Sequence, residues 1–161
     1  APPDRIGKAV EATYEEEEKP RHQVPRLGPD ARGVHRILVV EDDPDTRHLL
    51  ETVLEKEEYE VVTAEDGESA LETLDEVGGF HLLTLDLKLP GIGGLEVLER
   101  VRRRPRWQHL PVIVATGYGD PEVEITLFEA GADDFIVKPV DPRRFILRVR
   151  AVLRRRGSDE G

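Results

Sequence analysis

The chain has 161 residues, 38% of them hydrophobic and 35% charged, with a formal net charge of −11, and this length fits a single domain with one hydrophobic core. The negative charge argues against binding to nucleic acids or anionic membranes, because both attract cationic proteins. Cysteine is absent, which excludes disulfides and thiolate chemistry, and no apolar run reaches the roughly 20 residues of a membrane span, so we expect a cytoplasmic protein.

The N-terminal part, residues 1–34, differs in composition from the rest of the chain. It contains several prolines and the acidic run Glu15–Glu18, with few large apolar residues. Segments of this kind rarely bury enough apolar surface to fold by themselves, so we expect an extension or linker that is flexible or loosely docked. Ile6, Val10 and Tyr14 recur at helical spacing and allow for one short helix there.

From Arg36 onward, short apolar runs alternate with amphipathic helical stretches. Three of the runs are almost continuously apolar, as in strands covered by helices on both faces, and the alternation favours parallel pairing. The sequence therefore predicts an α/β domain over residues 35–156, an open five-stranded parallel sheet with helices on both faces, followed by a tail at 157–161. The predicted strands are 37–40, 60–63, 82–85, 112–115 and 135–137, each followed by a helix.

Polar residues of functional type follow or close these strands, at the end of an open parallel sheet where ligands usually bind. Taken singly, each has a plain structural explanation. Asp43 precedes Pro44 and suits a helix N-cap, Thr116 is a β-branched strand residue, and Lys138 suits a solvated surface. Their coincidence at one edge of the sheet favours a shared site. The residues are Asp42, Asp43, Asp86, Thr116 and Lys138.

The residue types in this group suit phosphoryl transfer. Three converging carboxylates, those of Asp42, Asp43 and Asp86, repel one another unless a cation lies between them, and hard oxygen ligands suit Mg²⁺. Phosphoryl transfer needs an in-line nucleophile with positive charge and hydrogen-bond donors around the phosphoryl oxygens. Asp86 can attack, Lys138 can neutralise charge, and Thr116 can donate a hydrogen bond.

The motifs that carry these residues are similar to those of response-regulator receiver domains, the CheY-like family of two-component signalling systems. The resemblance covers about residues 35–156 and implies a flavodoxin-like (βα)5 fold with strand order 2-1-3-4-5. The matching motifs are Val39-Val40-Glu41-Asp42-Asp43, Leu85-Asp86 followed by Leu89-Pro90-Gly91 and Gly94, Ala115-Thr116, and Lys138-Pro139.

The resemblance implies a role for each site residue. Asp86 would be the phosphoacceptor and a metal ligand, phosphorylated by a sensor histidine kinase or a histidine phosphotransfer protein. Asp43 would bind Mg²⁺ directly, Asp42 mostly through water, and Lys88 through its backbone carbonyl. Beyond phosphorylation and dephosphorylation of itself, no enzymatic activity is implied.

The resemblance also implies a conformational switch. Thr116 and Phe135 would be the switch residues, and Lys138–Pro139 a cis peptide, which only X-Pro bonds adopt readily. Lys88 and Tyr118 occupy positions that influence the lifetime of the phosphoryl group, and because neither side chain would orient an attacking water well, we predict slow self-hydrolysis. The face formed by the fourth helix, fifth strand and fifth helix would bind a downstream effector.

A phosphorylation-dependent homodimer through this last face is a further expectation. Asp133-Asp134 and Arg148 resemble charges that one receiver subfamily uses for dimerisation, although Arg144 stands where that subfamily usually has an acid. The arginine clusters 102–104 and 154–156 lie at predicted helix C-termini, where cations complement the helix dipole, so they do not predict nucleic-acid binding.

Two alternatives to a phosphorylated receiver are compatible with parts of this sequence. An enzyme of the haloacid-dehalogenase type also uses an aspartate nucleophile with Mg²⁺, but it needs a second aspartate two residues later, where this chain has Lys88. A receiver-like interaction module that is not phosphorylated has the same fold. Such modules typically lose an acidic ligand, the acceptor or the lysine, whereas this chain carries all of them.

Overall fold

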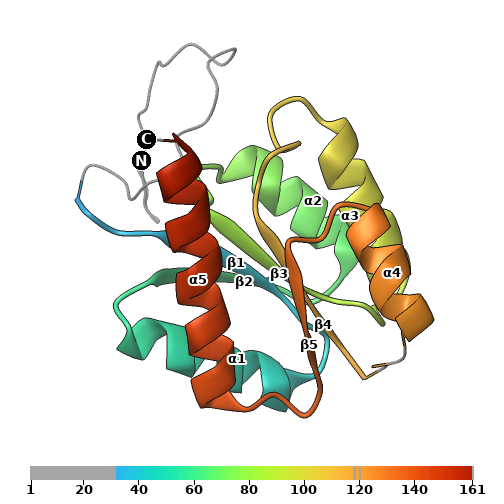
Figure 1. The fold of residues 1–161 in the computed structure, drawn as a ribbon, viewed down its shortest axis with the longest axis horizontal. Helices are drawn as coiled ribbons and strands as arrows, with labels where there is room; N and C mark the ends of the chain where they lie inside the picture. The colour runs from blue at the N-terminus through green and yellow to red at the C-terminus, as the bar shows by residue number, and fades with distance from the viewer. Residues whose placement is uncertain (1–31, 118, 120, 161) are drawn as a thin grey trace.

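The computed structural model describes residues 32–160 except 118 and 120, with side chains to Arg155. Five parallel strands form one sheet in the order β2-β1-β3-β4-β5, as predicted (Figure 1). The short helix expected around Val10 lies outside the described residues. The strands are β1 (Arg36–Val40), β2 (Glu60–Ala64), β3 (Leu82–Asp86), β4 (Val112–Thr116) and β5 (Asp134–Val137). The helices are α1 (Pro44–Lys56), α2 (Gly67–Glu76), α3 (Gly94–Arg103), α4 (Pro121–Glu129) and α5 (Pro142–Glu160).

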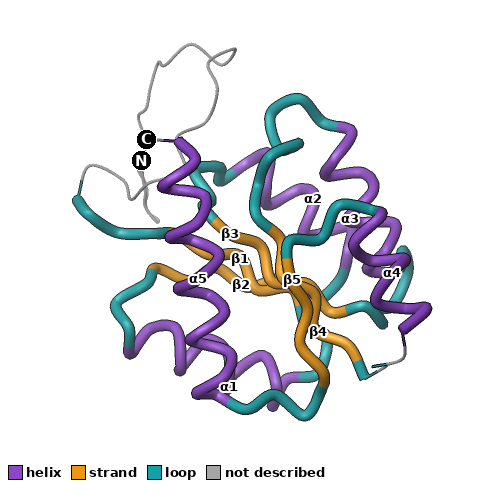
Figure 2. Tube along the Cα trace, in the orientation of Figure 1, coloured by secondary structure: helices purple, strands orange, loops and turns teal. Residues whose placement is uncertain are grey.

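Helices cover both faces of the sheet. α1 and α5 lie on one face, and α2, α3 and α4 lie on the other (Figures 1 and 2). Because successive strand residues point to opposite faces, Ile37 and Val39 pack in the core with α1 and α5, whereas Leu38 and Val40 pack in the core with the other three helices. Burial on both faces is the reason that the central strands are apolar throughout.

The parallel register brings the carboxyl ends of four strands to one edge of the sheet. Val40 lies opposite Leu85, Asp86 opposite Ala115, and Thr116 opposite Val137. The pairing continues just past the strands, where the amide of Lys138 donates a hydrogen bond of 2.7 Å to the carbonyl of Thr116. The residues that follow β1, β3, β4 and β5 are therefore neighbours in space although they are far apart in sequence.

The last helix is longer than predicted. α5 continues to Glu160, so most of the segment 157–161 that the sequence assigned to a tail is helical. Gly157 has low helix propensity, yet the helix continues through it. No helix in the described part of the chain is both long and apolar enough to cross a membrane.

Candidate functional site

Asp86 is the last residue of β3 and is almost completely buried, with 4% of its surface exposed. Its Oδ2 lies 3.2 Å from the ammonium Nζ of Lys138. The backbone N–H of Lys88 donates a hydrogen bond of 3.2 Å to Oδ1. A buried carboxylate is costly unless it is paired, and here one cation and one amide offset that cost.

Glu41, which the sequence analysis did not single out, is the second buried acid of the site. It directly follows β1 and is 1% exposed. Lys138 Nζ lies 2.9 Å from Glu41 Oε1 and 3.0 Å from Oε2, so the lysine after β5 bridges Glu41 and Asp86. A glutamate placed directly at the end of a buried strand is the signal that could have revealed it.

The carboxylates that converge are those of Glu41, Asp42 and Asp86, whose oxygens lie within 4.8 Å of one another. Asp43, expected as a ligand, lies outside this group. Its Oδ2 accepts hydrogen bonds from the backbone N–H of Thr46 at 2.8 Å and from the Thr46 hydroxyl at 2.7 Å. Asp43 is thus the N-cap of α1, the plain structural reading of an aspartate before a proline.

The charges of the group are unbalanced, because it holds three carboxylates and only one ammonium, which is paired with Glu41 and Asp86. Burial, followed by the charge of Glu41, raises the pKa of Asp86 to about 6, and Lys138 only partly offsets this. Burial disfavours the charge of Lys138, but its bonds to Glu41 and Asp86 outweigh burial and raise the lysine pKa. The excess negative charge and the hard oxygen donors fit a Mg²⁺ ion.

Asp43 differs from Asp86 in the direction of its pKa shift as well as in its location. The two hydrogen bonds from Thr46 lower its pKa, with smaller contributions from Lys138 and Arg47. A carboxylate stabilised in this way by a helix N-terminus is already satisfied.

Several of the remaining predicted residues lie at the same end of the sheet as Asp86. Thr116 ends β4, is fully buried, and follows Ala115, the strand partner of Asp86. The Lys138–Pro139 peptide is cis, as expected. Lys88 contacts Asp86 through its backbone N–H, and Tyr118 lies outside the described residues. The sheet edge therefore gathers the carboxylate of Asp86, a hydroxyl and a lysine, together with Glu41 and Asp42.

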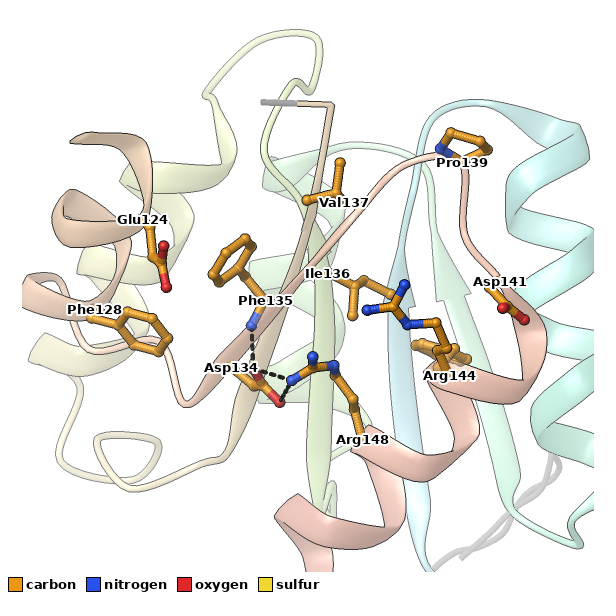
Figure 3. A pocket seen from close by; sticks show the side chains of 11 residues that line it. Glu124, Phe128, Asp134, Phe135, Ile136, Val137, Pro139, Asp141, Arg144 and Arg148 are labelled. Atoms are coloured by element: carbon orange, nitrogen blue, oxygen red, sulfur yellow. Dashed lines mark hydrogen bonds and ion pairs between the residues drawn. The ribbon is translucent and has the colours of Figure 1, made fainter. Parts of the chain in front are cut away.

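Phe135 lies beside a groove between α4, β5 and α5 (Figure 3). The groove has a volume of about 400 Å³. The Phe135 ring packs edge-on against that of Phe128 on α4, with centroids 5.9 Å apart and planes at 72°. Phe128 is 42% exposed, and charged side chains such as Asp134 and Arg144 line the same groove, so the groove presents both apolar and charged groups to solvent next to Phe135.

The charges expected for a dimer face separate into two groups. Asp134 and Arg148 pair at 3.0 Å on the wall of the groove (Figure 3). Asp133 instead points inward, where it pairs with Arg102 at 3.1 Å and accepts a hydrogen bond of 2.8 Å from the backbone N–H of Val112. Asp133 therefore ties α3 to β4 and is not a surface charge.

The chain is similar to proteins of known class. Residues 37–150 match the model of the response regulator receiver domain. The chain is 42% identical over 126 residues to the transcriptional regulatory protein ResD of Bacillus subtilis (strain 168), which covers 78% of this chain and 51% of that protein. It is 39% identical over 124 residues to SrrA of Staphylococcus aureus (strain NCTC 8325 / PS 47), covering 77% and 50%. The chain spans about half the length of these relatives.

Solved structures give the same result. A CheY-like receiver domain protein from Methanospirillum hungatei JF-1 superposes with a TM-score of 0.72 at 34% identity, over 80% of this chain and 99% of that one. The BeF3-activated receiver domain of RstA from Klebsiella pneumoniae gives 0.69 at 32% identity, over 74% and 99%. The fold, the family model, the relatives and the solved structures agree: the chain belongs to the response regulator receiver domain family of two-component systems.

Proposed function

We propose that the chain is a phosphorylation-dependent switch in which Asp86 accepts a phosphoryl group from a sensor histidine kinase or a histidine phosphotransfer protein. One observation carries the proposal: the buried Asp86 carboxylate lies 3.2 Å from the ammonium of Lys138 and within 4.8 Å of oxygens of Glu41 and Asp42. A nucleophilic carboxylate beside positive charge is what phosphoryl transfer needs. We place this activity in the cytoplasm.

Mg²⁺ is the cofactor that the donor set supports. Its candidate ligands are Glu41, Asp42, Asp86 and the backbone carbonyl of Lys88, and Glu41 takes the place expected of Asp43, whose carboxylate caps α1. Mg²⁺ prefers oxygen ligands and usually keeps several waters, so it does not require every one of these groups directly. When bound, the ion would neutralise negative charge on the phosphoryl oxygens.

The side chains of the site have complementary roles in the proposed transfer. A carboxylate oxygen of Asp86 forms a new bond to phosphorus while the bond from phosphorus to the donor histidine nitrogen breaks, and the electron pair of that bond stays with the imidazole. The ammonium of Lys138 pairs with one phosphoryl oxygen, and the hydroxyl of Thr116 donates a hydrogen bond to another. With its pKa near 6, Asp86 is mostly ionised at neutral pH and ready to attack.

The signal would leave through the groove between α4, β5 and α5. A phosphoryl group shifts two conformations only by its different affinity for them, and Thr116 drawn toward it would leave space for Phe135, which packs on Phe128 of α4. We propose that this face binds a downstream effector and supports a phosphorylation-dependent homodimer. Slow self-hydrolysis, tuned by Lys88 and Tyr118, belongs to the same proposal.

Phosphorylation by acetyl phosphate, a small-molecule donor, tests this function. With Mg²⁺ present, we expect the intact mass to increase by one phosphoryl group, and with EDTA we expect no increase. Asp86→Asn should abolish the gain, whereas Asp45→Asn, which removes an exposed acid on α1, should leave it unchanged. Mass is a better measure than tryptophan fluorescence, because Trp107 precedes β4 at the opposite end of the strands.

The same experiment separates the receiver from an interaction module that is not phosphorylated. A folded native chain that gains no mass with acetyl phosphate and Mg²⁺, and that binds no beryllofluoride, would support the second class. The intact set of Glu41, Asp42, Asp86 and Lys138 in one cluster favours the first.

A further inference from the structure

Arg47 lies near the N-terminus of α1 and reaches back to the loop that carries the acidic residues. Its Nη1 donates a hydrogen bond of 2.8 Å to the backbone carbonyl of Glu41 and a longer one of 3.3 Å to that of Asp42. The Arg47 side chain is 19% exposed, and its Nη2 lies 3.9 Å from the exposed carboxylate of Glu65. Arg47 therefore contacts the main chain of the acidic loop.

The charge of Arg47 has opposing effects where it lies, because it helps to lower the pKa of nearby Asp43 but is unfavourable in two other respects. Cations near a helix N-terminus oppose the helix dipole, and a cation beside a divalent-metal site repels the metal. Its ion pair with Glu65 is long and has one exposed partner, and such pairs contribute little. The two backbone hydrogen bonds are the main contacts that the position gains.

Glu41 and Asp42, the acids of this loop that converge with Asp86, are held to different degrees. The amide of Glu41 donates a hydrogen bond of 3.0 Å to the carbonyl of Ala64, and its carboxylate is bonded to Lys138. Asp42 is exposed, and within the described part of the chain its side chain has no hydrogen-bonding partner. Asp42 is thus oriented through its backbone, and one of the bonds of Arg47 is made to that backbone.

We propose, on the basis of the Mg²⁺ site proposed above, that Arg47 is a positioning residue that increases Mg²⁺ affinity by bridging the backbone carbonyls of Glu41 and Asp42. The charge of Arg47 and its positioning role predict opposite changes in Mg²⁺ affinity when the side chain is replaced. If the charge of Arg47 dominated, its removal would strengthen Mg²⁺ binding. If positioning dominates, its removal weakens binding, because the Asp42 carboxylate loses its fixed orientation.

Calorimetric titration of the metal-free chain with MgCl₂ measures the Mg²⁺ affinity and so distinguishes a gain from a loss. Arg47→Met removes the charge and all donors but keeps an unbranched apolar stem, and we expect Mg²⁺ affinity to fall about 10-fold, the usual loss when groups that orient metal ligands are removed. Arg47→Lys keeps one donor group but not the planar guanidinium, so its Mg²⁺ affinity should lie between those of the native chain and Arg47→Met. Lys56→Gln removes a cation at the other end of α1 and should bind as the native chain does.

Urea denaturation in EDTA, measured alongside, establishes that each variant is folded. Native or stronger Mg²⁺ affinity in a folded Arg47→Met would overturn the inference. If Arg47→Met does not fold, Arg47→Lys carries the test, and native or stronger affinity there would have the same consequence. A native chain that fails to bind Mg²⁺ would instead overturn the proposed function, so the two failures are distinguishable.

Discussion

At the scale of single residues, Asp42 and Asp43 are adjacent acids with different partners, and asparagine substitutions separate their roles. Asp42→Asn removes a carboxylate from the cluster, and we expect Mg²⁺ affinity to fall at least about 10-fold, because affinity depends on ligand charge. Asp43→Asn keeps a good helix cap and should bind Mg²⁺ nearly as the native chain does. Calorimetry that finds the opposite order would return Asp43 to the ligand set.

The burial of Asp86 predicts a pH-dependent stability of the metal-free chain. Its pKa is raised from 3.8 to about 6, so the folded state binds a proton more tightly than the unfolded chain. The resulting stabilisation is complete below about pH 3.8 and is lost as the pH rises through about 6. We expect the free energy of unfolding in EDTA to rise by about 1–2 kcal/mol between pH 7.5 and 5 relative to Asp86→Asn.

Urea denaturation of both proteins at the two pH values measures this difference. Asp86→Asn should also be the more stable protein at pH 7.5, because it removes a buried charge that is only partly paired. Equal pH dependence in the two proteins would show that Asp86 is not desolvated as described.

At the scale of elements, β3 contains a buried polar group that is not part of the site. Thr84 is 2% exposed, and its hydroxyl has no hydrogen-bonding partner among the described residues. Thr84→Val replaces it with an apolar group of the same shape, so we expect the free energy of unfolding to rise by about 1 kcal/mol. Urea denaturation measures the change, with Thr63→Val in the less buried β2 as the comparison. A loss of stability would indicate that the hydroxyl is satisfied.

The elements themselves could be predicted well, because their signals are local. Runs such as Ile37–Val40 are apolar throughout, and strands buried on both faces require this. The ends were less certain: Asp86 and Thr116 are polar, yet they are the last residues of β3 and β4. Asp86 and Thr116 belong to their strands because they pair with residues of the neighbouring strands. The sequence of a single strand does not show which residues it pairs with.

At the scale of the whole molecule, the site depends on the register between strands, which explains why Asp43, expected as a ligand, lies outside the group of converging carboxylates. Val40 lies opposite Leu85, so one further step along the two chains brings Glu41 beside Asp86. The acidic triplet 41–43 contains three carboxylates, and only the register and the N-cap of α1 decide which of them enter the site. Neither can be read from the triplet alone.

The central claim is that Asp86 accepts phosphate beside a metal held by the acids that follow β1. A crystal structure of the chain with Mg²⁺ and beryllofluoride measures this most directly. We predict beryllofluoride on a carboxylate oxygen of Asp86, in contact with Lys138 and Thr116, and Mg²⁺ bound by oxygens of the cluster Glu41, Asp42 and Asp86. Beryllofluoride on another residue, or Mg²⁺ bound at Asp43 and away from Glu41, would contradict the account.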